Sequence, residues 1–250
     1  MASDNNINDK LLNCYENWLN TIVQPEKKKE FNSVQLSDVF VSGVSKYNSN
    51  EKTILFIGQE SRDWKWDENN KLVFFQKYSV GYLNRQIYSW ELNRDEKSQY
   101  KCNRSPFWNF IRQFRDQYNV IWTNINKLHG ITDGKTCAFT DKIETFNKPF
   151  CFDGKCQSIL LHEIDIIKPD IIICMAGNSC IRQKYINSAF GEDITKQEAY
   201  SDFFDNKELF TIGDYNNAKI IFTHHPRYIQ QRYPKPKPMK NFAQAVKEKL

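Results

Sequence analysis

Three short polar clusters, each directly after an apolar run, carry the residue types that could do chemistry in this chain. The clusters are Gly58-Gln59-Glu60-Ser61, Thr123-Asn124-Ile125-Asn126-Lys127 and Thr223-His224-His225-Pro226-Arg227. In parallel α/β sheets, side chains just beyond the carboxyl ends of the strands converge on one crevice. The pattern therefore predicts that an acid, amides and a histidine meet in one site.

The first cluster supplies the acid. Gly58 is expected to let the backbone turn sharply at the strand end, so that Gln59 and Glu60 face the crevice. A carboxylate there can orient a water molecule or balance a developing positive charge, and the Gln59 amide can contact a ligand. The alternative for Glu60 is a solvated loop residue.

The other two clusters supply amides and an imidazole. Asn124 directly follows the apolar run, and Asn126 alternates with it along the chain. An amide presents both a donor and an acceptor, which suits the edge of a nucleobase, although Asn also commonly forms turns. His225 precedes a proline and can donate a hydrogen bond to an anion that develops on a leaving group. For His224, which should point the other way, we expect a structural role.

Four strand-like runs separated by helices must position these clusters. The expected strands are 53–57, 120–122, 171–175 and 219–223, and the expected helices are 11–22, 105–114, 159–167 and a short one ending at Leu250. A second helix-like stretch runs from 34 to 44, whereas 25–30 reads as a charged break, 61–70 as a loop and 130–154 as irregular. The pattern predicts an α/β fold, a three-layer α/β/α architecture with a central four-stranded parallel sheet.

Length and composition are typical of a globular protein. The 250 residues, 40% of them hydrophobic, fit one domain over residues 1–250, with a helical N-terminal extension (about 1–50) and a basic C-terminal segment (227–250). The first residues are polar, and the longest apolar runs are far too short to cross a bilayer. We therefore expect a cytoplasmic monomer without membrane contacts.

The cysteines give no sign of a metal site. Their number, seven, is odd, which argues against a complete disulfide framework. Cys151 and Cys156 flank a turn, but no second Cys or His pair has the spacing of metal ligands. We expect neither a metal nor another cofactor.

Positive charge gathers at the end of the chain. Of the net charge of +5, residues 227–250 contribute +6, from seven Lys or Arg against Glu248, which leaves −1 for the remainder. Such a segment directly after His225 could bind phosphates, and the alternative is a solvated tail.

In their order and spacing, the polar clusters resemble the motifs of the uracil-DNA glycosylase superfamily. The matching segments are Gly58-Gln59-Glu60-Ser61 (Gly-Gln-Asp-Pro or Gly-Glu-Ala-Pro in the family), Thr123-Asn124-Ile125-Asn126-Lys127 (Thr-Asn-x-x-Lys), Ile167-Lys168-Pro169-Asp170-Ile171 with Ala176-Gly177 (a Lys-Pro-Asp strand and glycine turn) and His225-Pro226 (His-Pro). The resemblance covers roughly residues 53–229. Because each motif is short, the ordered set is more specific than any one of them.

The resemblance implies a DNA repair enzyme, a glycosylase that flips a nucleotide and hydrolyses its N-glycosidic bond to excise uracil or another altered base. Glu60 would position water or stabilise the sugar cation, and His225 would stabilise the departing anionic base. Asn124 would hydrogen-bond the flipped base, with Gly58 and Gln59 also at the base-binding site.

The resemblance also implies contacts to DNA and a ring that stacks on the base. The DNA contacts would be Lys127, Arg227, Tyr228 and Ile229, the last three in the loop that fills the vacated stack. The stacking aromatic would be Phe74 or Phe75, with Trp64, Trp66 and Tyr78 as competing candidates, and core packing is the alternative for all five.

Three positions depart from the family pattern. Glu60 is one methylene longer than the Asp of the family motif, and Ser61 replaces a stiffening Pro. Arg62 stands where some members carry a Tyr that excludes thymine, so selectivity for uracil cannot be transferred. The long loop expected from 63 to 100 could admit a larger or modified base.

Two other classes of function remain open at this point. One is a catalytically inactive nucleic-acid-binding protein on the same fold, which would need the basic segment but no poised Glu60. The other is a hydrolase of free nucleosides or nucleotides, which would use the same crevice without contacts to DNA. Similarity of fold cannot choose among them.

Overall fold

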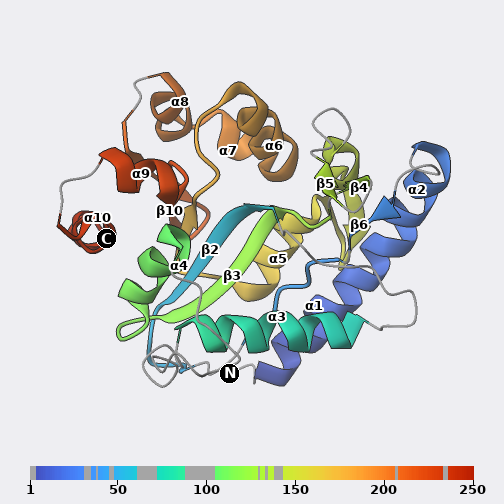
Figure 1. Ribbon diagram of the computed structural model, residues 1–250. Helices are drawn as coiled ribbons and strands as arrows, with labels where there is room; N and C mark the ends of the chain where they lie inside the picture. Colours follow the sequence, from blue (N-terminus) through green and yellow to red (C-terminus); the bar gives the residue numbers. More distant parts are fainter. Residues whose placement is uncertain are drawn as a thin grey trace.

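A five-stranded, mostly parallel sheet forms the centre of the molecule (Figure 1). The computed structural model describes residues 4–30, 35–37, 39–44, 48–60, 72–87, 105–128, 130–132, 135–137, 143–205, 208–232 and 236–250. In spatial order the strands are β3 (Asn119–Asn126), β2 (Thr53–Glu60), β8 (Ile171–Cys174), β10 (Ala218–Thr223) and β9 (Phe210–Tyr215). The first four are parallel to one another, and β9 is antiparallel to β10.

Alternate residues of each strand enter two different hydrophobic cores, one on each face of the sheet. On β2, Leu55 and Ile57 belong to one core, whereas Ile54 and Phe56 belong to the other. Strands that are buried on both faces need near-continuous apolar sequences, which these are. The predicted α/β class and three-layer arrangement are confirmed, and the sheet has one strand, β9, more than the four predicted.

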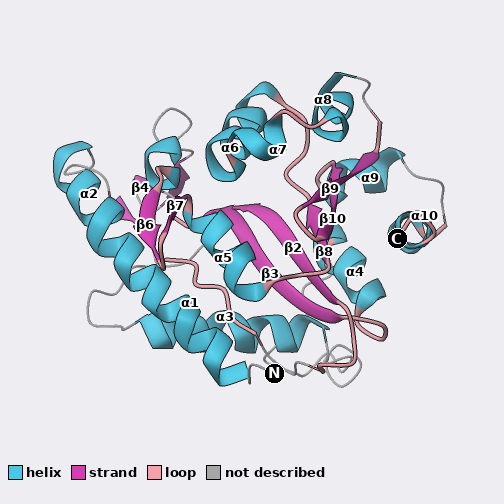
Figure 2. Ribbon diagram, turned by 180° about the vertical axis from the view of Figure 1, so that it is seen from behind, coloured by secondary structure: helices cyan, strands magenta, loops and turns pink. Residues whose placement is uncertain are grey.

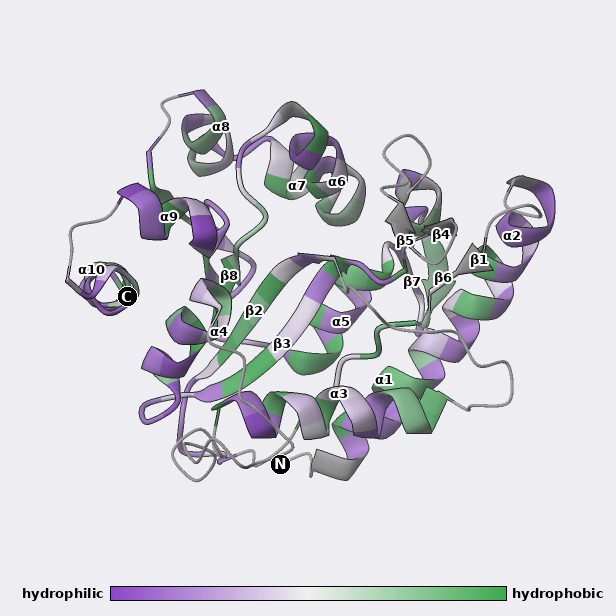
Figure 3. Ribbon diagram, viewed as in Figure 1, coloured by the Kyte–Doolittle hydropathy of each residue, from purple (hydrophilic) through white to green (hydrophobic). Residues whose placement is uncertain are grey.

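Helices cover both faces. The first face carries α1 (Asp4–Trp18), α5 (Ile159–Ile167), α6 (Cys180–Phe190), α7 (Glu192–Thr195) and α8 (Glu198–Asp205). The second carries α4 (Pro106–Ile111), η2 (Arg112–Phe114), α9 (Pro226–Arg232) and α10 (Pro238–Lys247), while α3 (Leu72–Ile87) contributes to both cores. Figure 2 shows α5 in front of the sheet on the first face, with α1 beside it. Hydrophobic residues line the central strands, whereas α2 (Gln24–Glu30) is mainly hydrophilic (Figure 3).

The expected helix starts are confirmed where capping chemistry is strong. Ser105 caps α4, with its Oγ accepting from the Trp108 amide at 3.5 Å, and Pro106 occupies the first turn, where no N–H is needed. Ser158 caps α5 in the same way, accepting from the Leu161 amide at 3.3 Å.

Several predictions about the N-terminal third are wrong. The predicted charged break at 25–30 is helix α2, which continues from α1 through the π-helix η1 (Leu19–Val23). Lys and Glu, which make up residues 26–30, are good helix formers, and Pro25 lies in the first turn of α2. The helix expected at 34–44 is absent from its described residues, where Gln35–Leu36 form strand β1 and 39–44 have no regular structure. The loop expected from 63 to 100 contains helix α3, and the loop at 61–70 lies outside the described residues.

The region expected to be irregular, 130–154, contains short pairs of strands. β1 pairs with β4 (Gly130–Thr132), which pairs with β5 (Lys135–Cys137), and β6 (Phe150–Phe152) pairs with β7 (Lys155–Gln157) after the 3-10 helix η3 (Ile143–Asn147). A disulfide between Cys151 and Cys156 joins β6 and β7 across the predicted turn. No helix in the described part of the chain is long and apolar enough to span a bilayer.

Candidate functional site at the carboxyl edge of the sheet

Backbone contacts bring the ends of four strands to one edge of the sheet. Gly58 and Glu60 of β2 pair in register with Asn124 and Asn126 of β3. Beyond the last pairs of β8, the Met175 amide donates to the Ile57 carbonyl at 2.8 Å, and the Gly177 amide donates to the Thr223 carbonyl at 3.2 Å. Glu60 and Asn124 therefore lie on adjacent strands, and His225 follows β10 at the same edge, two strands further along.

The role expected for Gly58 is wrong, and a different one takes its place. Strand β2 continues through Gly58 to Glu60, and Gly58 has no left-handed φ, so it makes no turn. Instead the Oδ1 atom of Asn124 occupies the space that a Cβ on residue 58 would need, and the Phe107 Cε2 atom lies 3.4 Å from that point. The glycine thus makes room for the Asn124 amide. The glycine turn expected after the strand at 171–175 is present at Gly177, whose φ is 85°.

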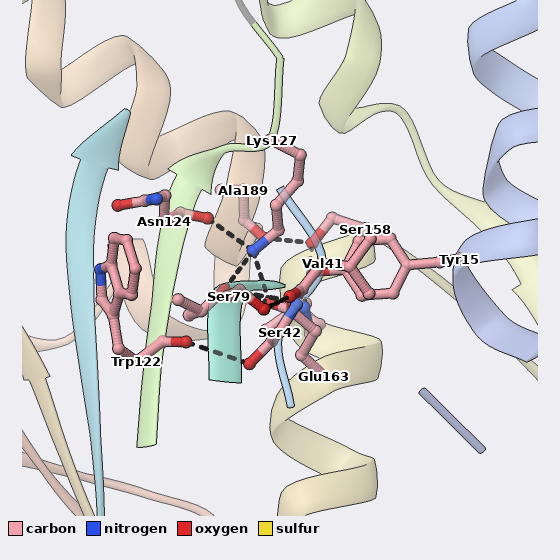
Figure 4. A network of polar contacts seen from close by, with 12 residues as sticks. Tyr15, Val41, Ser42, Ser79, Trp122, Asn124, Lys127, Ser158, Glu163 and Ala189 are labelled. Atoms are coloured by element: carbon pink, nitrogen blue, oxygen red, sulfur yellow. Dashed lines mark hydrogen bonds and ion pairs between the residues drawn. The ribbon is translucent and has the colours of Figure 1, made fainter. Parts of the chain in front are cut away.

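The backbone of Asn124 is fixed by a hydrogen bond, whereas its side-chain nitrogen has no partner among the described residues. The residue is 2% exposed, and its Nδ2 has no hydrogen-bond partner among the described residues. Its carbonyl oxygen accepts from the Lys127 ammonium at 2.5 Å. In Figure 4 the amide extends away from Lys127, on the side where β2 lies. A buried amide with an unpaired donor is suited to hydrogen-bond a ligand.

Lys127 lies inside the protein, in an ion pair with Glu163 of α5. Its Nζ is 2.5 Å from Glu163 Oε2 and also donates to Thr123 Oγ1, and the two charged side chains are 1% and 0% exposed (Figure 4). Burial lowers the pKa of Lys127 below its ordinary value, an effect that the Glu163 carboxylate opposes. All three ammonium protons therefore have acceptors, and the pair fixes the backbone from which Asn124 projects.

The N-terminal helix completes this network. Tyr15 of α1 donates its hydroxyl proton to Glu163 Oε1 and accepts from the Ser42 amide at 3.1 Å. Burial, with the adjacent Glu163 carboxylate, raises the pKa of Tyr15 well above its ordinary value, so the phenol remains a donor. Thr123 Oγ1 adds a contact of 3.0 Å to Glu163 Oε2.

His225 is half-buried and oriented by the start of α9. Its Nδ1 accepts from the Arg227 amide at 3.2 Å. In a neutral ring the proton must then be on Nε2, which leaves that atom as the donor. His224 is buried, its ring stacked on that of Tyr228 at 4.4 Å, in keeping with the structural role expected for it.

Arg182 is a site residue that the sequence analysis missed. Its Nε donates to Gln59 Oε1 at 3.1 Å, which links α6 to the end of β2. A Cβ on Gly177 would lie 3.0 Å from the guanidinium NH1 and 3.6 Å from the His225 backbone nitrogen. A positive charge thus lies beside Gln59 and against the Gly177 turn, to which the His225 backbone is also close. The one sequence feature that could have indicated Arg182 is the glycine turn at Ala176-Gly177, since the helix that follows it starts beside the site.

The candidate aromatic and DNA-contacting residues are in very different environments. Phe75 is buried in the core, whereas Phe74 is 51% exposed. Arg227 and Tyr228 are exposed on α9, whereas Ile229 is fully buried beneath it. The ring that lies against Gly58, on the side that the Asn124 amide also occupies, is Phe107 near the start of α4, which was not predicted.

Within the described part of the chain, no three His, Cys, Asp or Glu side chains are grouped so that they could hold a metal ion. The functional groups that the sequence brings to this edge are a carboxylate, amides, an imidazole and a guanidinium.

Comparison with known proteins identifies the family of this chain. The family model of the uracil DNA glycosylase superfamily matches residues 45–248, a range that contains all three polar clusters and the central sheet. A search of curated proteins found no significant match. The chain belongs to the uracil DNA glycosylase superfamily.

Proposed function

We propose that this protein is a DNA glycosylase that excises uracil or another altered base by hydrolysis of the N-glycosidic bond. Membership of the superfamily makes glycosylase activity the first expectation. The observation that carries the proposal is the register of β2 and β3, which pairs Gly58 with Asn124 and Glu60 with Asn126 at the edge where His225 also lies.

In the proposed reaction, a flipped nucleotide occupies this edge. Glu60 orients a water molecule, accepts one of its protons and stabilises the positive charge on the sugar. The water oxygen bonds to C1′ of the sugar, and the bond between C1′ and the base nitrogen breaks, with its electron pair leaving on the base. The His225 Nε2–H donates a hydrogen bond to the resulting anion.

Base recognition is assigned to Asn124, whose amide nitrogen is buried and unpaired. Phe107 is the aromatic ring best placed to stack on the base, because it lies beside both Gly58 and Asn124. Arg182 adds a positive charge that can stabilise either the anionic base or a DNA phosphate.

Contacts to DNA are assigned to the exposed face of α9. Arg227 and Tyr228 are exposed there and directly follow His225. Lys127 and Ile229 are not included, since the first is paired with Glu163 and the second is part of the core. Binding through Arg227 should weaken as the salt concentration rises.

The test uses oligonucleotides that carry uracil or another altered base at one position, as single strands and as duplexes. Alkali cleaves abasic products, so excision appears as strand breaks. Removal of the donor at Asn124 or His225 by substitution with alanine should reduce single-turnover excision about 100- to 1000-fold. The matched control is Asn13→Ala, on the exposed surface of α1.

Each competing function has its own signature in this assay. Salt-sensitive binding without strand breaks for any base would favour a non-catalytic DNA-binding protein. Turnover of free nucleosides without affinity for DNA would favour a nucleoside hydrolase.

A further inference from the structure

Asn126, the last residue of β3, is buried like Asn124 but has no assigned role. Side chains two residues apart on a strand point to the same face, so Asn126 lies on the face of β3 that carries Asn124 and Trp122. It is 2% exposed and pairs in register with Glu60.

The side-chain amide of Asn126 is buried without a hydrogen-bond partner among the described residues. Neither its Nδ2 nor its Oδ1 has a partner within the described part of the chain. Four of the five such buried side-chain atoms among the described residues lie on this one face of β3, on Trp122, Asn124 and Asn126, and the fifth is on His224 just after β10. Unpaired polar groups are thus concentrated at the candidate site.

The opposite end of the same strand shows what a structural asparagine looks like in this fold. Asn119 is also buried, but its Oδ1 accepts from the Asn48 amide at 2.7 Å. Its Nδ2 donates to the carbonyls of Asn48 and Glu51 at 2.7 and 3.0 Å. A buried amide without hydrogen-bond partners lowers the stability of the fold. Such a loss of stability is common at residues whose role is to bind a ligand.

We infer that Asn126 is a second base-contacting residue, which acts with Asn124 on the flipped base; the inference rests on the proposed glycosylase function. The unpaired atoms of the two residues comprise two donor groups and one acceptor. Their complement is a base edge with two acceptors and one donor, as in uracil, its 5-substituted forms and cytosine. Of these, uracil-type bases leave more easily, because two carbonyl groups delocalise the charge of the departing anion.

Thio-substituted substrates test this contact with only a small change in base shape. Single-turnover excision is measured on oligonucleotides that carry uracil, 2-thiouracil or 4-thiouracil, since sulfur accepts hydrogen bonds weakly. Asn126→Ala should reduce excision of uracil roughly tenfold to a hundredfold, the effect of one lost base contact. One of the two thio substitutions should lower the excision rate of the wild type by a similar factor. The same substitution should not lower the excision rate of Asn126→Ala any further, because that variant has already lost the contact.

Stability measurements separate this role from a structural one. Asn126→Ala should leave the midpoint of thermal unfolding unchanged or raise it, because the amide has no hydrogen-bond partner in the described part of the chain. The control Asn119→Ala should lower that midpoint and leave the preference among the three bases unchanged. Asn126→Asp, which keeps the shape and removes the donor, should follow Asn126→Ala in its loss of excision.

Two results would overturn the inference. In the first, the wild type excises uracil, but Asn126→Ala and Asn126→Asp excise it at the same rate as the wild type and are slowed by the thio substitutions to the same extent. The second is a wild type that excises only bases with a different edge, such as adenine or hypoxanthine. If the wild type excises no base at all, the proposed function fails first, and the inference fails with it.

Discussion

Asn124 lies over Gly58 on the neighbouring strand, and its Oδ1 fills the space that a Cβ on residue 58 would occupy. The side chain assigned to base recognition is therefore compatible only with a glycine opposite it. This relationship links the first and second motifs of the superfamily physically, because the glycine of one determines where the amide of the other can lie.

Gly58→Ala should displace the Asn124 amide and reduce single-turnover excision at least about tenfold, through loss of a base contact. The fold should survive, since the Cβ would meet the end of a flexible side chain. The control is Gly81→Ala on α3, where a Cβ would meet nothing within 4 Å and should raise stability by about 0.5–1 kcal/mol. Wild-type excision by Gly58→Ala would contradict the assignment.

Lys127→Met should destabilise the protein by about 3–5 kcal/mol, because it leaves the Glu163 carboxylate buried without its counter-charge. The double variant Lys127→Met/Glu163→Gln removes both charges and should recover at least half of that loss. Urea unfolding of the two variants measures this difference. A single variant as stable as the wild type would show that the pair carries no such role.

Phe107→Ala should slow excision roughly tenfold to a hundredfold if this ring stacks on the base, since such stacking contributes about 1–3 kcal/mol. Phe74→Ala, on an exposed ring, should change neither excision nor stability appreciably. Phe75→Ala should instead lower stability by about 3–5 kcal/mol, as expected for a core aromatic. A selective loss of excision in Phe74→Ala would return the stacking role to that residue.

Stability should fall as the pH decreases below about 6.5, the ordinary pKa of histidine. Burial lowers the pKa of His224 and of His162 in the folded protein. The unfolded chain therefore binds more protons between that pH and the folded pKa values, so protonation favours unfolding. Urea unfolding at pH 7.5 and 5.5 should show a smaller difference for His224→Phe than for the wild type. An equal difference would exclude a contribution from His224.

The central strands were predictable because parallel strands buried on both faces are almost continuously apolar. Strand β9 was not, since it lies at the edge of the sheet and its Gly213 and Asp214 interrupt any apolar pattern. The polar residues from Gln59 to Glu60 and from Asn124 to Asn126 were expected after the strands. They lie within them, because pairing between β2 and β3 continues to the end.

The sequence predicted which polar clusters form the candidate site, but not the side-chain contacts that hold them in place. Glu60, Asn124 and His225 follow from the rule that strand ends share an edge. The contact between Tyr15 and Glu163 spans 148 residues, and neither residue stands in a recognisable motif. Arg182 and Phe107 were missed for the same reason, since only the packing of α6 and α4 brings them to the edge.

The position of Tyr15 bears on how the chain can be shortened. The family match begins at residue 45, so α1 lies before it, yet this helix supplies a donor to Glu163 and places Leu11 and Trp18 in the core. A fragment trimmed to the matched range would expose that apolar surface and leave one oxygen of a buried carboxylate without its phenol. The matched range therefore needs α1, a helix outside all of the family motifs, to remain folded.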